Sequence, residues 1–155
     1  EYCETFANGW NSNSQDGIDG NGAYNIIKYN LSYDNVDNGA GTNEAGSGGG
    51  IEVGGYSDLN NETNNIVENN TCYGNKYHGI SVMRRPSGDT IYKNIVYNND
   101  GPGILITTRH YYDPIYHVDT YTRHDKISQN SIYDNDGLGI DLCSVESDNY
   151  QNGDE

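Results

Sequence analysis

The sequence predicts an all-β solenoid, in which short strands stack coil upon coil around a narrow core. Three observations support this fold class: a repeated segment, a Gly-Ile motif that follows each copy of it, and a composition rich in turn-forming residues. The 155 residues include 20 Gly and 15 Tyr, and only 33% of them are hydrophobic. A repeat unit too short to bury its own apolar side chains becomes stable when neighbouring units stack on it.

The repeated segment has the pattern aliphatic-x-x-Asn-x-x-Tyr-x-Asn. Four copies occupy residues 27–35, 67–75, 91–99 and 127–135, and a shorter match, "TFAN", lies at 5–8. The shortest interval between copies is 24 residues, which suits a bare coil of short strands and turns. The longer intervals contain two long loops, at about 36–50 and 107–124. We therefore expect one domain over 1–155, of about five to six coils, which belongs to a longer solenoid if the chain is a fragment.

Each copy is preceded or followed by a short alternating segment that begins with Gly-Ile. These segments are "GIDG" (17–20), "GIEV" (50–53), "GISV" (79–82), "GILI" (103–106) and "GIDL" (139–142). Alternation with a period of two predicts strands, and the density of Gly, Asn and β-branched residues disfavours helix. Stacking predicts two inward columns, one of Ile18, Ile51, Ile80, Ile104 and Ile140 and the other of Val53, Val82, Ile106 and Leu142.

Two polar or aromatic columns follow from the same alignment. The first Asn of each repeat predicts an asparagine ladder, whose amides hydrogen-bond from coil to coil: Asn30, Asn70, Asn94 and Asn130. The aromatic column consists of Phe6, Tyr33, Tyr73, Tyr97 and Tyr133. It forms either a structural aromatic stack or a face on which sugars stack.

The charge of the chain restricts its partners. The formal net charge is −15, with 8 Lys and Arg against 23 Asp and Glu. This balance argues against nucleic acid and against an anionic membrane surface, and no apolar run is long enough for membrane insertion. It fits cations, or acidic sugars bridged by cations; solubility or adaptation to high salt is the alternative reason. Sequons at Asn30, Asn61 and Asn69 favour a secreted or cell-surface protein, and a start at Glu1 suggests a mature or excised piece.

An acidic patch is expected at the first two coils. Asp19 and Glu52 follow the column isoleucines, so they should face outward on adjacent strands, and Asp16 lies one short turn earlier. Like charges in direct opposition are destabilising, and a hard cation such as calcium would relieve the repulsion. The alternative is a solvated acidic face whose charges splay apart.

A family resemblance extends these observations. The segments "CETFANGWNSNSQDGIDG" (3–20), "GSGGGIEVGG" (46–55) and "CYGNKYHGISVMRRPSGDTIYKNIVYNN" (72–99) resemble the core of the family-nine polysaccharide lyases, which include β-helical pectate lyases. The resemblance implies a right-handed parallel β-helix, and calcium-dependent β-elimination on an acidic polysaccharide. By position, Asp16 and Asp19 match calcium ligands of an Asp-Asp-Gly-x-Asp motif, and Gln15 stands where its first Asp belongs. Glu52 stands where the family has its lysine base, so we expect Glu52 to serve as a metal ligand instead.

Basic residues near the patch are the remaining candidates for a sugar site. Arg84 and Arg85 would clamp sugar carboxylates and, with Lys76, are weak candidates for a replacement base; surface pairing of the arginines with acidic residues is the alternative. Lys93 is a further weak candidate.

The remaining metal and thiol candidates have simpler explanations. His110, His117 and His124 are spaced seven apart, unlike zinc motifs, and His78 is separate from them. Asp100 and Asp136 occupy matching turns, where Asp-Gly turn chemistry is the alternative to calcium binding. Cys72 is expected to be a buried free thiol, and no disulfide with Cys3 or Cys143 is predicted.

Two function hypotheses remain. The first is an extracellular, carbohydrate-active β-helix that acts on or binds acidic polysaccharide with calcium. The second is a non-catalytic structural or adhesive β-helix that self-associates end to end into filaments, because a β-helix has open strand edges at both ends unless they are capped.

Overall fold

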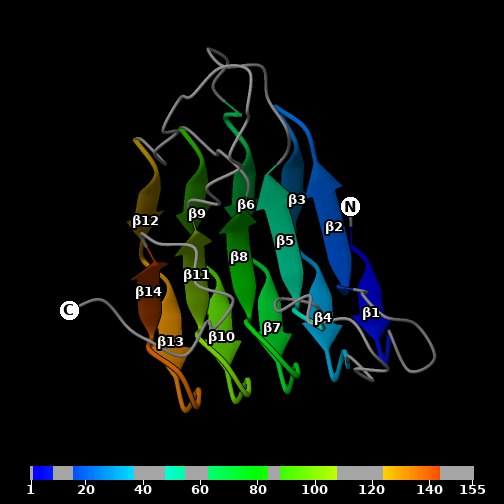
Figure 1. The fold of residues 1–155 in the computed structure, drawn as a ribbon. Coiled ribbons are helices and arrows are strands. Elements are labelled where there is room, and N and C mark those ends of the chain that lie inside the picture. The colour runs from blue at the N-terminus through cyan, green and yellow to red at the C-terminus, as the bar shows by residue number, and fades with distance from the viewer. Residues whose placement is uncertain are drawn as a thin grey trace, which may run out of the picture.

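The computed structural model describes residues 2–8, 16–36, 48–54, 63–83, 88–107 and 124–143. These residues contain fourteen short strands and no helix, so no membrane-spanning helix occurs among them. The coils stack along one axis, and each strand lies side by side with the equivalent strand of the next coil (Figure 1). Most of the two expected long loops, 37–47 and 108–123, lies outside the described residues.

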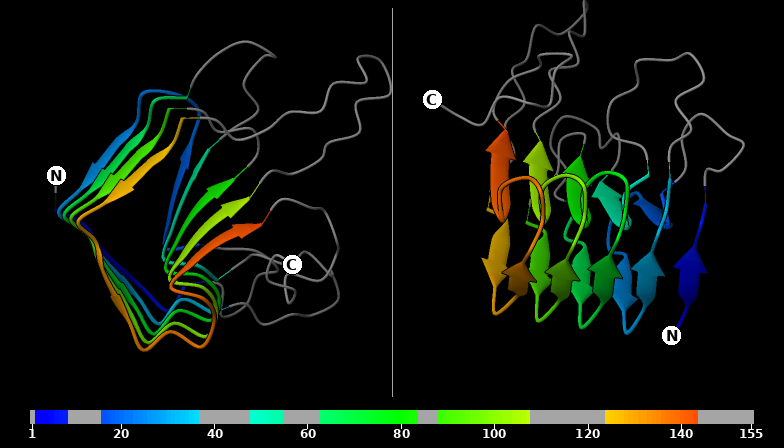
Figure 2. Two further views of the ribbon diagram at one scale, coloured as in Figure 1. Left: turned by 90° about the vertical axis from the view of Figure 1, so that its left-hand side faces the viewer. Right: turned by 90° about the horizontal axis from the view of Figure 1, so that it is seen from below.

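Every strand pair is parallel, and the strands form three sheets. Viewed along the axis, the sheets form the sides of each coil (Figure 2). The tyrosine sheet contains β1 (Glu4–Phe6), β4 (Leu31–Tyr33), β7 (Thr71–Tyr73), β10 (Ile95–Tyr97) and β13 (Ser131–Tyr133). The Gly-Ile sheet contains β2 (Ile18–Asn21), β5 (Ile51–Gly54), β8 (Ile80–Met83), β11 (Ile104–Thr107) and β14 (Ile140–Cys143). The third sheet contains β3 (Ile26–Lys28), β6 (Ile66–Glu68), β9 (Thr90–Tyr92) and β12 (Lys126–Ser128). The chain is therefore an all-β parallel β-helix, as the repeats predict.

The strand register matches the predicted columns. Ile18 pairs with Ile51, and the isoleucine column continues through Ile80 and Ile104 to Ile140. In the middle coils this column is fully buried, together with Val53 and Val82 of the second column. The alternation of the Gly-Ile segments fixes the register, because a slip of one residue would turn the whole apolar set outward. These two apolar columns form the core together with inward residues of the other two sheets: Ile27, Val67, Ile91, Cys72 and Val96.

The predicted asparagine ladder is present at the corner between the third sheet and the tyrosine sheet. The Nδ2 amide of Asn30 donates to Oδ1 of Asn70 (2.9 Å), Asn70 donates to Asn94 (3.1 Å), and Asn94 donates to Asn130 (3.0 Å). The backbone amides of Asn30, Asn70 and Asn94 donate to the same oxygens. The side-chain oxygen of each internal asparagine thus accepts bonds from both the backbone amide and the side-chain amide of the preceding ladder residue.

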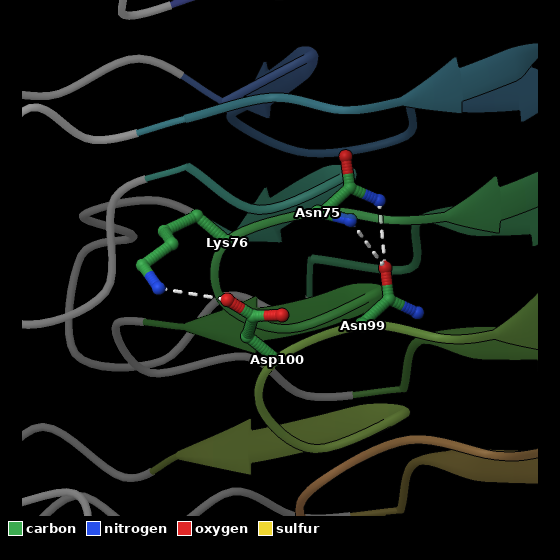
Figure 3. A network of polar contacts seen from close by, with 4 residues as sticks. All are labelled: Asn75, Lys76, Asn99 and Asp100. Carbon is green, nitrogen blue, oxygen red and sulfur yellow. Dashed lines mark hydrogen bonds and ion pairs between the residues drawn. The ribbon is translucent and has the colours of Figure 1, made fainter.

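Two more ladders run along the other corners. The last Asn of each repeat forms one of them, through Asn8, Asn35, Asn75, Asn99 and Asn135. The other consists of Asn25, Asn65, Asp89 and Asp125, in which carboxylates replace amides in the later coils. Figure 3 shows Asn75 donating to Asn99 within one of these ladders.

The residue before each ladder residue has a left-handed backbone conformation, which explains the sharp corners. The φ angle is 59° at Tyr29, 55° at Asn69, 57° at Lys93 and 57° at Gln129, directly before the four asparagines of the predicted ladder. Non-glycine residues adopt this conformation only when local bonds compensate for the steric cost. The side chain and backbone of the following asparagine supply such bonds, so the bend and the ladder stabilise each other.

The aromatic column is a continuous stack on the outside of the tyrosine sheet. Ring centroids lie 5.4 Å apart between Phe6 and Tyr33, 5.0 Å between Tyr33 and Tyr73, and 5.0 Å between Tyr73 and Tyr97. Tyr97 and Tyr133 continue the stack at 5.1 Å, with planes 5° apart. Because each internal ring has both faces against a neighbouring ring, the column is a structural stack and leaves the sugar-stacking alternative only the ring edges.

Candidate metal centre

The candidate site lies at the start of the Gly-Ile sheet, where three successive strands begin. Two residues before the isoleucine column, the register aligns Asp16, Gly49 and His78. The backbone amide of Gly17 donates to the carbonyl of Gly49 (2.9 Å), and that of Gly50 donates to the carbonyl of His78 (3.0 Å). This position therefore holds an acid, a glycine and an imidazole on three neighbouring coils.

Three possible metal ligands converge there. One carboxylate oxygen each from Asp16 and Glu52 and a ring nitrogen of His78 all lie within 4.8 Å of one another. Glu52 is the second residue of β5, whereas Asp16 and His78 precede β2 and β8. The cluster thus takes one ligand from each of three coils.

Gly49 makes the convergence possible. A Cβ placed on this residue would overlap Nε2, Cδ2 and Cε1 of His78. The imidazole therefore lies in space that any other residue at position 49 would fill. On its other side, the backbone amide of Gly49 donates to Oδ1 of Asp16 at 2.7 Å, which orients that carboxylate.

His78 is fully buried, and its nitrogens are unsatisfied. Neither Nδ1 nor Nε2 has a hydrogen-bond partner among the residues that the structure describes. Burial lowers the pKa of His78 from 6.5 to about 4, so the ring is neutral at pH 7 and carries a free lone pair. Buried polar groups in native proteins normally have a partner, and an orphaned one calls for a specific explanation.

The column of Glu52 differs from the expectation of an open acidic face. Glu52 is only 6% exposed and its neighbour Ser81 is fully buried, although both lie on the side of the sheet opposite the isoleucines. The Ser81 hydroxyl has no hydrogen-bond partner within the described residues. The expectation that this column faces outward is right in register, but solvent does not surround it in the middle coils.

Asp19 pairs in register with Glu52, as the alignment predicts, yet its carboxylate is not part of the cluster. The side chain is exposed, and its Oδ2 accepts a hydrogen bond from Nδ2 of Asn21 at 2.8 Å. Two of the three expected carboxylates, those of Asp16 and Glu52, therefore meet, and an imidazole takes the third position. Gln15, the fourth expected ligand, lies outside the described residues.

The basic candidates are placed differently. Lys76 donates from Nζ to Oδ2 of Asp100 at 2.7 Å, between turns of adjacent coils (Figure 3). This hydrogen bond raises the pKa of Lys76, so the amine stays protonated and is poorly suited to act as a base. Arg84 and Arg85 lie outside the described residues. Lys93 lies over the ring of Tyr92, 5.4 Å from its centroid, on the third sheet.

The other sequence candidates do not add to the site. His124 is exposed, and His110 and His117 lie outside the described residues. Asp100 is the ion-pair partner of Lys76, and Asp136 is an exposed turn residue. Cys72 is a buried free thiol, as predicted, and Cys3 is an exposed one.

The sequence analysis left His78 out of the site because it tested only the spacing of the histidines along the chain. The useful signal was available in the Gly-Ile alignment, one position before the glycine. That position holds Asp16, Gly49, His78, Pro102 and Leu138 in successive coils. A glycine between an acid and a histidine on stacked strands indicates that the two side chains approach each other across it.

Comparison of the chain with protein-family models, with curated proteins and with solved structures gave no match. The described donors of the candidate site are two carboxylates and one imidazole, which differs from the shell of oxygen ligands that calcium prefers and that the lyase resemblance implies.

Proposed function

We propose that the protein binds acidic polysaccharide through a divalent cation held by Asp16, Glu52 and His78. The observation that carries this proposal is the convergence of three ligand atoms within 4.8 Å at the start of the Gly-Ile sheet. The proposal includes a secreted or cell-surface location, where such polymers occur.

Charge explains why a cation is needed. A chain with a formal charge of −15 repels a polyuronate, and a metal ion that accepts ligands from both partners removes that repulsion locally. Three protein ligands leave coordination positions free for a sugar carboxylate. Asp16 is only partly buried, so the cluster reaches the surface on its side.

Binding is better supported than cleavage. β-Elimination needs a base near the acidic proton at C5, and Lys76 is protonated and paired with Asp100. Glu52, which stands at the position of the lysine base in the lyase resemblance, belongs to the metal cluster instead. The resemblance to family-nine lyases accordingly supports the choice of polymer more than it supports the reaction.

Isothermal titration of the full chain with polygalacturonate, alginate and a neutral glucan tests the proposal. We expect the two acidic polymers to bind in the presence of divalent metal, and binding to be lost on chelation or in Asp16→Asn. Absorbance from unsaturated sugars in the same samples detects cleavage. Equal binding with and without chelator, or no binding to either acidic polymer with metal present, contradicts the proposal.

A second candidate function is that of a structural module that stacks end to end. Apolar columns that are buried in the middle coils become exposed at the last described coil. Ile140 is 44% exposed, whereas Ile104 of the same column is fully buried. A further coil from another copy would cover this surface in the same register. Light scattering and electron microscopy separate filaments from monomers.

A further inference from the structure

We propose that the Asp16–Glu52–His78 cluster takes a transition-metal ion of the zinc class in preference to calcium, and that this ion ties three successive coils together. The inference rests on the proposed function, because it names the ion that the same site takes. It does not depend on the identity of the polymer.

Donor chemistry selects the class of metal. Calcium takes six to eight oxygen ligands and makes little use of imidazole. Zinc and its neighbours in the first transition series bind mixed imidazole and carboxylate sets, and three protein ligands with an open fourth position are typical of zinc. Asp16, Glu52 and His78 supply this kind of set.

The burial of His78 is an independent sign of a ligand. An imidazole with no exposed surface normally donates at least one hydrogen bond, and this one has no partner among the described residues. The ring nevertheless places a nitrogen within 4.8 Å of two carboxylate oxygens. A metal ion between these atoms would satisfy the nitrogen and offset the repulsion between the two acids.

The spacing suits a small ion. Zinc lies about 2.0–2.2 Å from nitrogen and oxygen ligands, so two ligand atoms of a tetrahedral site are roughly 3.3–3.6 Å apart. The three ligand atoms here lie within 4.8 Å of one another, so a pair at that limit has to close by roughly 1.2–1.5 Å when the ion binds. Glu52 and Asp16 reach the site by rotatable side chains, which allow that adjustment.

The ligands also span three coils, one each before β2, within β5 and before β8. An ion bound only to the folded state stabilises it according to the ratio of ion concentration to dissociation constant. We therefore expect zinc to stabilise this part of the β-helix as well as to create a binding point.

The experiment titrates the full chain, without polysaccharide, with Zn²⁺, Ca²⁺ and Co²⁺ after removal of metal. We expect one Zn²⁺ per chain, bound at least about 100-fold more tightly than Ca²⁺. At a Zn²⁺ concentration about 100 times the dissociation constant, Tm should rise by about 5–10 °C. Co²⁺ should show visible absorption typical of a low-coordinate site with a nitrogen ligand.

Two variants test the ligands and two serve as controls. His78→Gln and Asp16→Asn each remove a direct ligand, so each should weaken Zn²⁺ binding by at least the roughly 100-fold that loss of a residue supporting a ligand can cost. Asp16→Asn should still fold, because its amide oxygen can accept the bond from the backbone of Gly49. Asp19→Asn and His124→Ala, which alter an acid and a histidine outside the cluster, should leave binding within about threefold of the parent.

The inference is overturned if Ca²⁺ binds as tightly as Zn²⁺, if Asp19→Asn costs as much affinity as Asp16→Asn, or if Asp16→Asn leaves Zn²⁺ binding unchanged. Its failure is distinct from failure of the proposed function. Tight Zn²⁺ binding without polymer binding refutes only the polysaccharide proposal, and polymer binding that depends on Ca²⁺ alone refutes only the choice of metal.

Discussion

The imidazole of His78 occupies the space that a side chain on Gly49 would need. The two residues lie on neighbouring coils, and the backbone of Gly49 also hydrogen-bonds the carboxylate of Asp16. One glycine therefore sets the positions of two of the three proposed metal ligands without being one itself.

Gly49→Ala should abolish metal binding while all three ligands remain in the sequence. The added methyl group displaces the imidazole of His78, because the overlap involves three of its ring atoms. Over-packing of this kind also costs about 1–3 kcal/mol of folding stability. Calorimetric titration with Zn²⁺ and thermal unfolding measure the two effects.

Gly139→Ala is the matched control. Gly139 directly precedes β14 of the same sheet, and an added Cβ there meets only Cγ2 of Ile132 at 3.7 Å, an ordinary contact. Metal affinity and Tm should both stay near those of the parent. If Gly49→Ala binds metal as well as Gly139→Ala does, the role assigned to the glycine is wrong.

Removal of one internal ladder residue should destabilise the fold strongly. In Asn70→Ala, the backbone and side-chain amides of Asn30 lose their acceptor and the carbonyl of Ile27 loses its donor, because the Asn70 side chain makes all three bonds. Each buried group left unsatisfied costs about 1–3 kcal/mol, so the total should exceed about 3 kcal/mol. Urea unfolding at constant m-value measures the loss.

Asn130→Ala removes the last residue of the same ladder and provides the comparison. It accepts bonds from Asn94 but donates to no later ladder residue in the described coils, and it is only partly buried. We expect a smaller loss of stability than in Asn70→Ala. Equal losses would show that ladder position does not matter and that coil-to-coil continuity contributes little.

The two acids in the third ladder should make stability depend on pH. Burial raises the pKa of Asp125 to about 6 and also raises that of Asp89. A carboxyl with a raised folded-state pKa favours the native state when protonated, so its contribution is fully present below about pH 4 and is lost as pH rises through 6. The contribution of these two groups to Tm should therefore fall as the pH is raised from 4 to 8.

Asp125→Asn isolates that component. The amide oxygen can still accept the hydrogen bond that Asp125 receives from the backbone of Asp89, at 2.9 Å, while the titrating charge is gone. The variant should gain stability relative to the parent at pH 8 and show little difference at pH 4. A difference that is constant across this range would exclude Asp125 as the titrating group.

The thiols should differ sharply in reactivity. Cys72 is fully buried, and burial raises its pKa, whereas Cys3 is exposed. In a Cys143→Ser background, an aromatic disulfide reagent should modify Cys3 within minutes and Cys72 only on unfolding. Absorbance of the released thiolate follows both reactions, and rapid modification of two thiols in native buffer would contradict the assignment.

The sequence predicted the fold and its columns because stacking repeats one set of constraints in every coil. The Ile18-to-Ile140 column, the ladder from Asn30 and the tyrosine stack all follow from aligned spacing. The ladder from Asn25 was missed because it changes from amide to carboxylate at Asp89, so no single residue type marks it.

The site was predicted less well than the fold, for a physical reason. Asp19 and Glu52 were placed together by register, and Asp16 was added because it is close in sequence. In the structure Asp16 meets Glu52, whereas the side chain of Asp19 bonds to Asn21. His78 was missed because it lies in a turn, where its approach to the acids depends on the empty space over Gly49. A search for reactive side chains does not consider a glycine, and so it overlooks the space that Gly49 leaves open.

The corners of this β-helix have one more consequence, which concerns how such a chain can change over evolutionary time. Equivalent ladder residues are separated by 27, 40, 24 and 36 positions, yet the hydrogen bonds between them are nearly identical. Each ladder asparagine is held by its own bend and its own amide hydrogen bonds. The ladder therefore does not fix the number of residues between one asparagine and the next. The chain segments between successive ladder asparagines can therefore change in length or be exchanged independently of one another, while the stacked strands keep their geometry.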